Sequence, residues 1–341
     1  MAGSPKAQPS AFVFDDQAFR KKVPYTLTST NLTGAFASPA PPDNFDPNTA
    51  SAADLVKNGV LWRRPAASDN PALQQAWQTV FSRKWLAKNR IVPALDPQVG
   101  KTHILKQAPR KLSDQSFLGG AWSGAGTFTG GPWTTVIGYW KVPTVSKPSE
   151  PQGLEGGWNS SSWLGIDGMD FTIVSDDVLQ AGVQQVVNSS GTPSYVAWFE
   201  WYAPPQPNSP SYIWQTNITN FPVAPGDQMY CSVQYVGTTA GTIYLANERT
   251  GQHFSITLAP PPGATFKGNT VEWIMEAPDG GEPESSLPAF TPVNFTSAMA
   301  CNSSTINNPN TDDTCNIETT SNKVLTKVVL GNYAVTIDFI G

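Results

Sequence analysis

The chain has 341 residues and a formal net charge of −5, a length that allows one or two domains with a large core. Charged residues make up 14% of the chain, well below the roughly 25% usual for soluble proteins. Its 28 Gly and 31 Pro predict many turns and few long helices. No apolar run approaches the roughly 20 residues that a membrane-spanning helix needs.

Charge is distributed unevenly along the chain. Residues 1–115 carry 15 Lys or Arg and 8 Asp or Glu, whereas residues 116–341 carry 6 and 18. A basic segment joined to an acidic body could attract nucleic acid or an anionic lipid surface, or it could bind the acidic body of its own chain. No Lys- or Arg-rich run with interleaved aromatic residues is present. We therefore expect no nucleic-acid partner. We also expect no membrane partner and a monomer.

The N-terminal region contains two predicted helices. Residues 1–50 are rich in Pro, Ser, Thr and Asn, which predicts extended or loosely ordered chain. Residues 51–57 indicate a short helix, and residues 70–88 a longer one with Asn70 as N-cap and Pro71 at its first position. Apolar residues recur at helical spacing through the second segment, and this stripe predicts packing against a core.

From about residue 116 the pattern changes to short alternating runs separated by turn signals, which is typical of an all-β sandwich. The runs cover residues 134–143, 194–202, 228–236, 241–248, 253–259, 271–276 and 323–330. We predict a two-sheet antiparallel β-sandwich of the concanavalin-like or jelly-roll type over residues 116–341. A mostly irregular, partly helical segment, residues 1–115, precedes it.

Cysteines and glycosylation sequons indicate whether the protein is exported from the cell. Cys301 and Cys315 flank a polar loop that a disulfide could close, whereas Cys231 lies in a predicted strand and is expected as a buried thiol. Several N-x-[S/T] sequons favour an exported protein, although the first residues lack the apolar core of a signal peptide. The sequons begin at Asn31, Asn159, Asn188, Asn217, Asn294 and Asn302.

Several common types of site are excluded. The two histidines, His103 and His253, leave little room for a zinc site or a Ser-His-Asp triad, and we expect His253 to be a surface or structural residue. Neither G-x-S-x-G, a Walker A loop, H-E-x-x-H nor C-x-x-C occurs. The sequence also lacks the Asp-Thr-Gly or Asp-Ser-Gly of paired-aspartate proteases. We expect neither a metal nor a cofactor.

A strand with the sequence VEWIME, residues 271–276, carries two glutamates. Alternation places Glu272, Ile274 and Glu276 on one face, opposite an apolar face that includes Trp273. The more common explanation is an exposed face on a half-buried sheet. The alternative is a catalytic carboxylate that lines a cleft.

Two other predicted strands carry polar side chains beside aromatic ones. In AWFEWY, Trp198, Glu200 and Tyr202 share one face of the strand. In VLQAGVQ, Gln180 shares its face with Gly182, and a long amide beside a glycine suggests a place where another chain can approach closely. An aromatic-lined concave face would also suit a glycan-binding module.

These motifs, in this order, resemble those of the glutamic peptidases, the eqolisins. The match runs over residues 120–341 through GAWSGAGTF, GYWKVP, WLGIDG, LQAG, AWFEWY and VEWIME. The resemblance implies a metal-free endopeptidase that acts on polypeptides from the concave face of a sandwich. It implies Gln180 and Glu276 as the catalytic pair. It also implies substrate-binding or supporting roles for Trp163, Asp167, Trp198, Glu200 and Tyr202.

The implied pair makes chemical sense. Glu276 can take a proton from water and return it to the leaving amine, while the amide of Gln180 can donate to the oxyanion. Fungal members carry further aspartates where this chain has Gln184 and Val196, so acid conditions are expected but a very acidic optimum is not. The resemblance further implies that the basic residues 1–115 act as a propeptide-like segment, as the positively charged propeptide does in the family; a permanent extension packed on the sandwich is the alternative.

Two other functions remain open. A glycan- or protein-binding β-sandwich module does not require Gln180 and Glu276 to meet, whereas a peptidase requires both to reach one water and one carbonyl group. An inactive peptidase homologue kept for interaction is the other alternative, although the presence of both residues argues against it.

Overall fold

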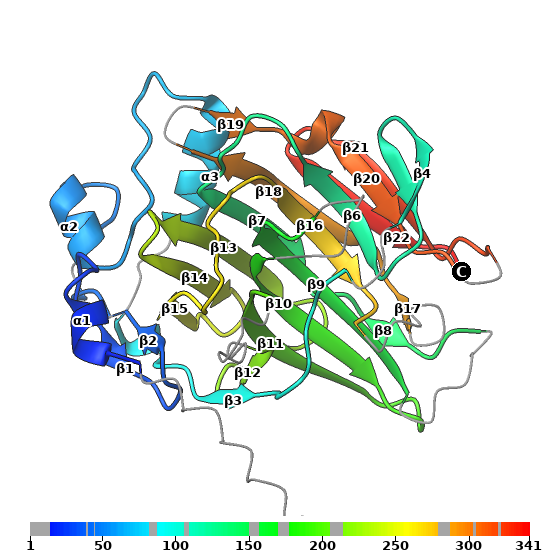
Figure 1. The fold of residues 1–341 in the computed structure, drawn as a ribbon, viewed down its shortest axis with the longest axis horizontal. Helices are drawn as coiled ribbons and strands as arrows, with labels where there is room; N and C mark the ends of the chain where they lie inside the picture. Colours follow the sequence, from blue (N-terminus) through cyan, green and yellow to red (C-terminus); the bar gives the residue numbers. More distant parts are fainter. Residues whose placement is uncertain are drawn as a thin grey trace, which may run out of the picture.

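The computed structural model describes residues 14–38, 40–43, 45–81, 87–105, 109–149, 157–169, 177–204, 214–278, 287–302, 305–319 and 322–341. Within these ranges the chain forms two large, mostly antiparallel sheets stacked face to face, with short helices beside them (Figure 1). The predicted all-β sandwich is confirmed. No helix in the described part of the chain is long and apolar enough to cross a membrane.

Sheet A forms one layer of the sandwich. In the described ranges it has ten strands, of which β19 (Ile306–Asn307) pairs only at the side of β18. The order of the others is β1 (Thr28–Ser29), β2 (Ala35–Ala37), β15 (His253–Leu258), β14 (Ala240–Asn247), β13 (Gln228–Val236), β7 (Thr135–Lys141), β18 (Val293–Cys301), β22 (Ala334–Phe339) and β21 (Thr326–Gly331).

Sheet B forms the other layer, and β8 (Val145–Ser146) and β17 (Ala289–Phe290) form a small separate ladder. The order in sheet B is β3 (Leu95–Pro97), β12 (Thr216–Ile218), β11 (Pro193–Tyr202), β10 (Val178–Val187), β9 (Trp158–Ile166), β16 (Val271–Glu276), β6 (Trp122–Thr127), β20 (Asp313–Asn316), β5 (Ser116–Leu118) and β4 (Arg110–Ser113).

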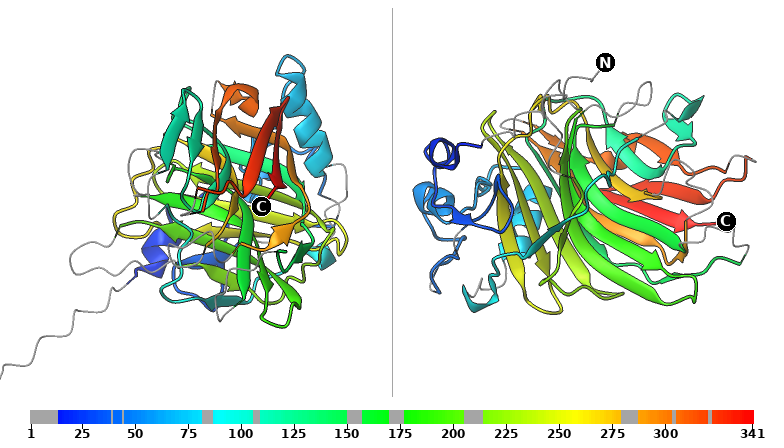
Figure 2. Two further views of the ribbon diagram at one scale, coloured as in Figure 1. Left: turned by 90° about the vertical axis from the view of Figure 1, so that its right-hand side faces the viewer. Right: turned by 60° about the horizontal axis from the view of Figure 1, so that its bottom comes forward.

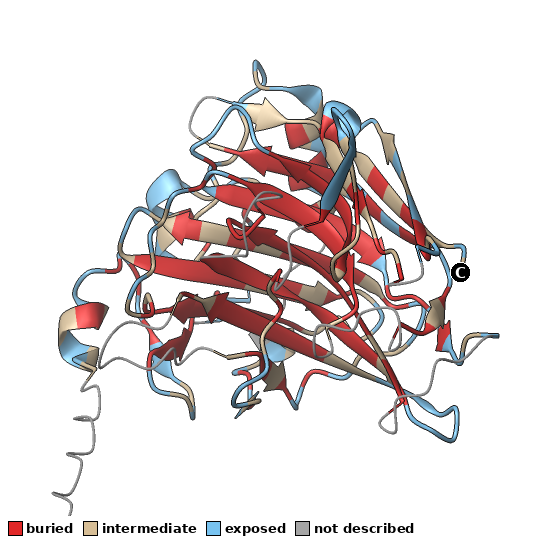
Figure 3. Cartoon of the chain, turned by 45° about the vertical axis from the view of Figure 1, so that its right-hand side comes forward, coloured by how far each residue is buried: buried red, intermediate tan, exposed pale blue. Residues whose placement is uncertain are grey.

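The main core lies between the two sheets and is formed by the side chains that face inward from both. Residues along the central strands are mostly buried (Figure 3). Trp273 of β16 points into this core, and its indole N–H donates to the carbonyl of Ile137 in sheet A at 2.9 Å. The opposite face of β16 is buried as well, with Glu272 and Glu276 at 0% and 1% exposure. The expectation that this face meets water is therefore wrong, and something else must cover it.

The predicted helices are present. In α2 (Ala52–Lys57), Ser51 is the N-cap and accepts a hydrogen bond from the N–H of Asp54. In α3 (Pro71–Phe81), Asn70 accepts from the N–H of Ala72 at 2.8 Å, as an N-cap does. The last part of the predicted helix, with Trp85 and Leu86, lies outside the described residues.

Residues 14–37 adopt regular structure that their composition does not predict. They form α1 (Asp16–Arg20), β1 and β2. Phe19, Tyr25 and Phe36 are buried together in a small apolar cluster that fixes this segment. Strand β2 also pairs with β15, so the segment extends sheet A.

The rest of residues 1–115 is likewise joined to the sandwich. Strand β3 pairs with β12 at one edge of sheet B, and β4 pairs with β5 at the other edge. The predicted boundary at residues 115 and 116 falls in the turn between β4 and β5. On the outer face of sheet A, α3 buries Trp77 and Phe81 against Tyr139 and Tyr230.

The disulfide that Cys301 and Cys315 could have formed is absent, because both are free thiols. Cys301 is buried on the outer face of sheet A beneath α3, whereas Cys315 is buried on the outer face of sheet B. Cys231 is a buried thiol in the core, as expected, and burial raises its pKa.

We expect Trp77→Ala to lower the free energy of unfolding by about 3–5 kcal/mol, because it leaves a cavity between α3 and sheet A. Trp77 is 1% exposed, and its indole N–H also donates to Asn48. Urea unfolding followed by fluorescence measures the change. Gln78→Ala on the exposed face of the same helix is the control. A loss below about 1 kcal/mol would mean that α3 does not stabilise the sandwich.

Candidate active site

Cross-strand register places the motif residues in three neighbouring rows on the outer face of sheet B, the face turned away from the main core. The first row is Glu200, Gln180, Gly165 and Glu272. The second row is Trp198, Gly182, Trp163 and Ile274. The third row is Val196, Gln184, Ser161 and Glu276. The row of tryptophans therefore separates the row of Gln180 from the row of Glu276.

The segment that follows β3 lies over this face. Strands β3 and β4 lie at opposite edges of sheet B, and residues 98–105 run over strands between these edges (Figures 1 and 2). We call residues 98–105 of this segment the strap. His103 and Leu105 of the strap are 0% and 1% exposed. The strap is thus the cover over the face that bears the glutamates.

His103 contacts residues of all three rows. Its backbone N–H donates to Glu200 Oε2 at 2.7 Å, and its carbonyl oxygen accepts from Gln180 Nε2 at 2.7 Å. Its ring Nδ1 lies 2.7 Å from Glu276 Oε2. The imidazole stacks on the indole of Trp198, with ring centroids 3.7 Å apart and planes within 9°. Gln180 and Glu276 therefore reach one and the same residue.

The carboxylate of Glu276 is held by a second donor. The indole N–H of Trp163 donates to Glu276 Oε2 at 2.7 Å. The ring of Trp163 in turn meets that of Trp122 edge to face at 4.8 Å. A buried carboxylate needs such donors to offset the loss of water, and rigid aromatic neighbours fix its position in the cleft.

The amide of Gln180 is placed by Glu200. Gln180 Nε2 lies 3.3 Å from Glu200 Oε2 in addition to its bond to His103. Gln180 Oε1 is buried and has no hydrogen-bond partner among the described residues. An amide with one donor aimed at a peptide carbonyl and an available acceptor can polarise that carbonyl and orient a water molecule.

Gly182 has a different role from the one its sequence context suggests. A Cβ at this position would lie 2.4 Å from the Cβ of Trp163 and 2.2 Å from the carbonyl oxygen of Ser162. The glycine thus makes room for the neighbouring strand of the same sheet, not for a separate chain. Because β9 and β10 come close together at Gly182, the side chain of Trp163 can lie over β10 and contact Glu276.

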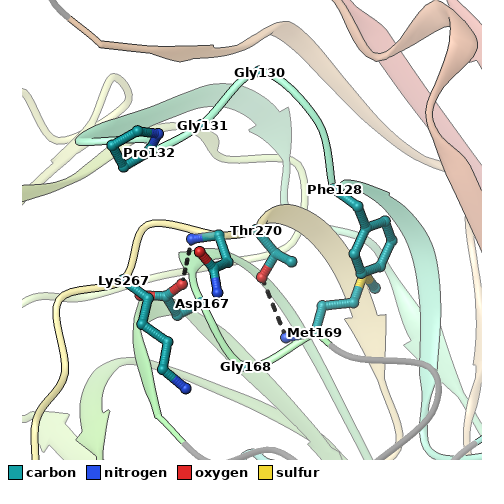
Figure 4. Close-up of a pocket in the computed structure, with 10 residues that line it drawn as sticks. Phe128, Gly130, Gly131, Pro132, Asp167, Gly168, Met169, Lys267 and Thr270 are labelled. Carbon is teal, nitrogen blue, oxygen red and sulfur yellow. Dashed lines mark hydrogen bonds between the residues drawn. The ribbon is translucent and has the colours of Figure 1, made fainter.

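Asp167 lies at the end of β9 in the left-handed region, with φ of 66°. Its carboxylate accepts from the N–H groups of Gly268 and Asn269 at 2.8 and 2.7 Å and from the hydroxyl of Tyr235 at 3.0 Å. These bonds hold the loop before β16 beside a hollow of about 600 Å³, which Asp167 lines (Figure 4).

The predicted cleft residues therefore fall into two groups. Trp163, Trp198 and Glu200 contact Gln180, Glu276 or the strap. Within the described residues, neither Asp167 nor Tyr202 is hydrogen-bonded to Gln180 or Glu276. Tyr202 is half-buried, and burial, followed by the nearby charge of Glu200, raises its pKa.

Sequence reasoning missed His103 as a residue of the site. The other histidine, His253, is buried in sheet A and not at the surface, and its backbone carbonyl accepts from the N–H of Ile91. In the described part of the chain, no three His, Cys, Asp or Glu side chains are grouped as a metal site requires.

Comparisons with known proteins show which family and fold this chain is similar to. Residues 120–339 match the model of the peptidase A4 family. Aspergillopepsin-2 of Aspergillus niger is 27% identical over 232 residues, which are 64% of this chain and 77% of that protein. Scytalidopepsin B of Scytalidium lignicola is 27% identical over 156 residues, 46% of this chain and 50% of that protein. The crystal structure of scytalido-glutamic peptidase with a transition-state analogue inhibitor superimposes with a TM-score of 0.52 at 22% identity, over 64% of this chain and 98% of that chain.

Buried carboxyls near the site make stability depend on pH. Burial raises the pKa of Asp167 and of Glu272, and it raises the pKa of Asp177 to about 6. A carboxyl with a raised pKa binds its proton more tightly in the folded than in the unfolded chain. Such a carboxyl therefore adds to the free energy of unfolding when the pH lies below its pKa in the folded chain. This added stability is lost as the pH rises through that folded-state pKa.

We expect the urea midpoint of unfolding to rise as pH falls from 7 to about 4.5. For Asp177 alone, with a pKa of about 6, the gain amounts to roughly 2 kcal/mol, at about 1.4 kcal/mol per pKa unit. Asp177→Asn should reduce this dependence, and Asp338→Asn near the C-terminus should leave it unchanged. A midpoint that falls steadily from pH 7 to 4.5 in the wild type would contradict the prediction.

Proposed function

Because this chain belongs to the peptidase A4 family, we propose that it hydrolyses polypeptides with Gln180 and Glu276 as the catalytic pair. The observation that carries the proposal is that both side chains bind one peptide residue, His103, at 2.7 Å each. This residue belongs to the strap, and a substrate residue would take its place.

The reaction follows from what each group can donate or accept. Glu276 takes a proton from a water molecule, whose oxygen attacks the scissile carbonyl carbon. Gln180 Nε2 donates to the oxyanion, just as it donates to the carbonyl of His103. Glu276 then gives the proton to the amide nitrogen, the C–N bond breaks, and a carboxylic acid and an amine leave. Trp163 and Glu200 keep the two side chains in place.

An acidic working pH belongs to the same proposal. Gln184 and Val196, which stand where the resembling fungal enzymes have aspartates, lie in the same row as Glu276. Without two more carboxylates beside it, Glu276 meets less like-charge repulsion, which supports a moderately acidic optimum.

Export from the cell is part of this proposal as well. The low share of charged residues, 14%, and the several sequons support it. Among the sequon asparagines, Asn188 stands exposed in the turn between β10 and β11.

The glycan-binding alternative has less support. Aromatic side chains do line the site, but Trp198 is covered by His103 and Trp163 is engaged with Glu276. A sugar-binding face would not require an amide and a carboxylate to converge on one peptide residue. The convergence is what hydrolysis of a peptide bond requires.

We expect Gln180→Ala to lower kcat about 100- to 1000-fold, the usual cost of one oxyanion donor. Glu276→Gln should lower it at least as far, because the amide cannot accept the proton of water. The assay measures cleavage of a denatured protein substrate from pH 2 to 7. Because the strap covers Gln180 and Glu276, the enzyme is assayed both before and after incubation in acid.

Two surface variants serve as controls for these measurements. Gln78→Ala on α3 removes a side-chain amide, as Gln180→Ala does. Glu248→Gln beside the turn between β14 and β15 replaces a carboxylate by an amide, as Glu276→Gln does. Both positions lie far from the cleft. Both should keep wild-type rates, and circular dichroism should show that all four variants fold. Equal cleavage by wild type and Glu276→Gln would end the assignment of the pair.

A further inference from the structure

Glu272 lies in the same row as Gln180 on the outer face of sheet B, and it takes no part in the reaction steps described for Gln180 and Glu276. The register places Glu272 opposite Gly165, and Gly165 opposite Gln180. On the other side of Gln180 the row continues to Glu200. The amide of Gln180 therefore lies between two carboxyl groups, and both of them are fully buried.

Gly165 lets the side chains of Glu272 and Gln180 share one space. A Cβ on this glycine would lie 3.0 Å from Glu272 Oε1 and 3.0 Å from the Cβ of Gln180. Because both atoms are 3.0 Å from the same point, they are at most about 6 Å apart. The amide extends beyond its Cβ, so its oxygen can reach the carboxyl of Glu272 directly or across one water molecule.

The first of the two carboxyl groups, that of Glu200, acts as an acceptor. Its Oε2 accepts from the backbone N–H of His103 at 2.7 Å and lies 3.3 Å from Gln180 Nε2. The donor end of the Gln180 amide is thus directed to Glu200 and to the carbonyl of His103. An amide has a donor end and an acceptor end, and the acceptor end, Oε1, requires a donor from another residue.

The second carboxyl group, that of Glu272, has a different environment. Within the described ranges neither of its oxygens has a hydrogen-bond partner. Burial raises the pKa of Glu272 well above its ordinary value, and the nearby charge of Asp167 raises it further. The hydroxyl of Thr270 lowers this pKa slightly, without hydrogen-bond geometry to either oxygen. Two other groups that interact electrostatically with Glu272, those of Tyr235 and Cys315, are also acids. Glu272 therefore holds a proton that it can donate.

Gln180 Oε1 is the acceptor that matches this proton. It is buried and, among the residues described, it has no hydrogen-bond partner. A buried acceptor without a donor is costly. An ionised Glu272 would increase this cost, because it would place one acceptor beside another. A neutral Glu272 supplies the donor that the amide oxygen lacks.

We propose that Glu272 is a positioning residue of the peptidase site: as a neutral acid it donates a hydrogen bond to Oε1 of Gln180, directly or across one water molecule. The proposal rests on the function proposed for Gln180. A hydrogen bond at Oε1 keeps Nε2 directed to the peptide carbonyl and polarises the amide, which makes Nε2 a stronger donor to the oxyanion. Because Oε1 has two lone pairs, one remains for the reacting water.

The first test compares full-length variants in the cleavage assay over a range of substrate concentrations. Glu272→Met removes the donor at similar size and should lower kcat about tenfold with KM unchanged, because the amide is needed most in the transition state. Glu272→Gln restores an N–H donor and should bring kcat back to within about threefold of wild type. Glu248→Met, at the half-buried glutamate after β14, is the control and should cleave at the wild-type rate.

A double variant separates positioning from a purely structural role. If Glu272 acts through Gln180, adding Glu272→Met to Gln180→Ala should lower kcat less than about twofold further. A purely structural role would give the same loss of about tenfold in both backgrounds. Thermal unfolding provides the check on folding. Glu272→Met should not lower the melting temperature, because it removes a buried acid without hydrogen-bond partners.

Infrared spectroscopy tests the neutral state of Glu272 without any measurement of activity. The difference spectrum between wild type and Glu272→Gln at pH 6 should contain the C=O stretching band of a protonated carboxylic acid, and this band should shift in heavy water. The difference spectrum for Glu248→Gln should contain the bands of an ionised carboxylate instead. Carboxylate bands in the spectrum for Glu272→Gln would overturn the proposal.

The outcomes separate this proposal from the proposed function. If Glu272→Met keeps the wild-type kcat while Gln180→Ala and Glu276→Gln abolish cleavage, Glu272 positions nothing and the catalytic pair stands. An equal loss in both backgrounds, without recovery in Glu272→Gln, likewise overturns the role of Glu272 alone. If Gln180→Ala cleaves as fast as wild type, or if neither the wild type nor any variant cleaves at any pH, both proposals fail.

Discussion

The buried carboxylate of Glu276 is the constraint on which the site depends. At 1% exposure it has lost most of its contact with water, and an unpaired buried carboxylate is costly. Two nitrogens offset this cost, one from Trp163 of the sheet and one from His103 of the strap. The first belongs to the rigid floor of the cleft. The second comes from a different segment of the chain, so the environment of Glu276 depends on the sheet and on the strap together.

Strands and their faces were predictable because alternation with a period of two reports which side of a strand is apolar. The predicted run at 228–236 is β13 itself. The rows that join Gln180, Trp163 and Glu276 also follow from alternation once the strands are paired. Which strands pair, and in what register, depends on contacts far apart in the chain. For this reason the sequence could suggest the pair through a family resemblance but not the row of tryptophans between them.

His103 and the regular structure before residue 115 were not predictable, for a different reason. The sequence VGKTHILKQAP has no periodicity that would set the histidine apart, and its place follows only from a chain that must join opposite edges of one sheet. In the same way, the alternation of VEWIME could not show that a strap, and not water, covers Glu272 and Glu276. Cys301 and Cys315 form no disulfide because, although they are near in sequence, one lies in sheet A and the other in sheet B.

The opposite charges of the two parts of the chain contribute little to how they are joined. Among the described residues, Arg110–Glu318 is an ion pair across the boundary, with the arginine side chain half-exposed, and exposed pairs contribute about 1 kcal/mol or less. By contrast, the ladders of β2, β3 and β4 and the burial of Trp77 tie residues 14–115 to both sheets. Acid that neutralises carboxylates would leave these ladders and this packing in place.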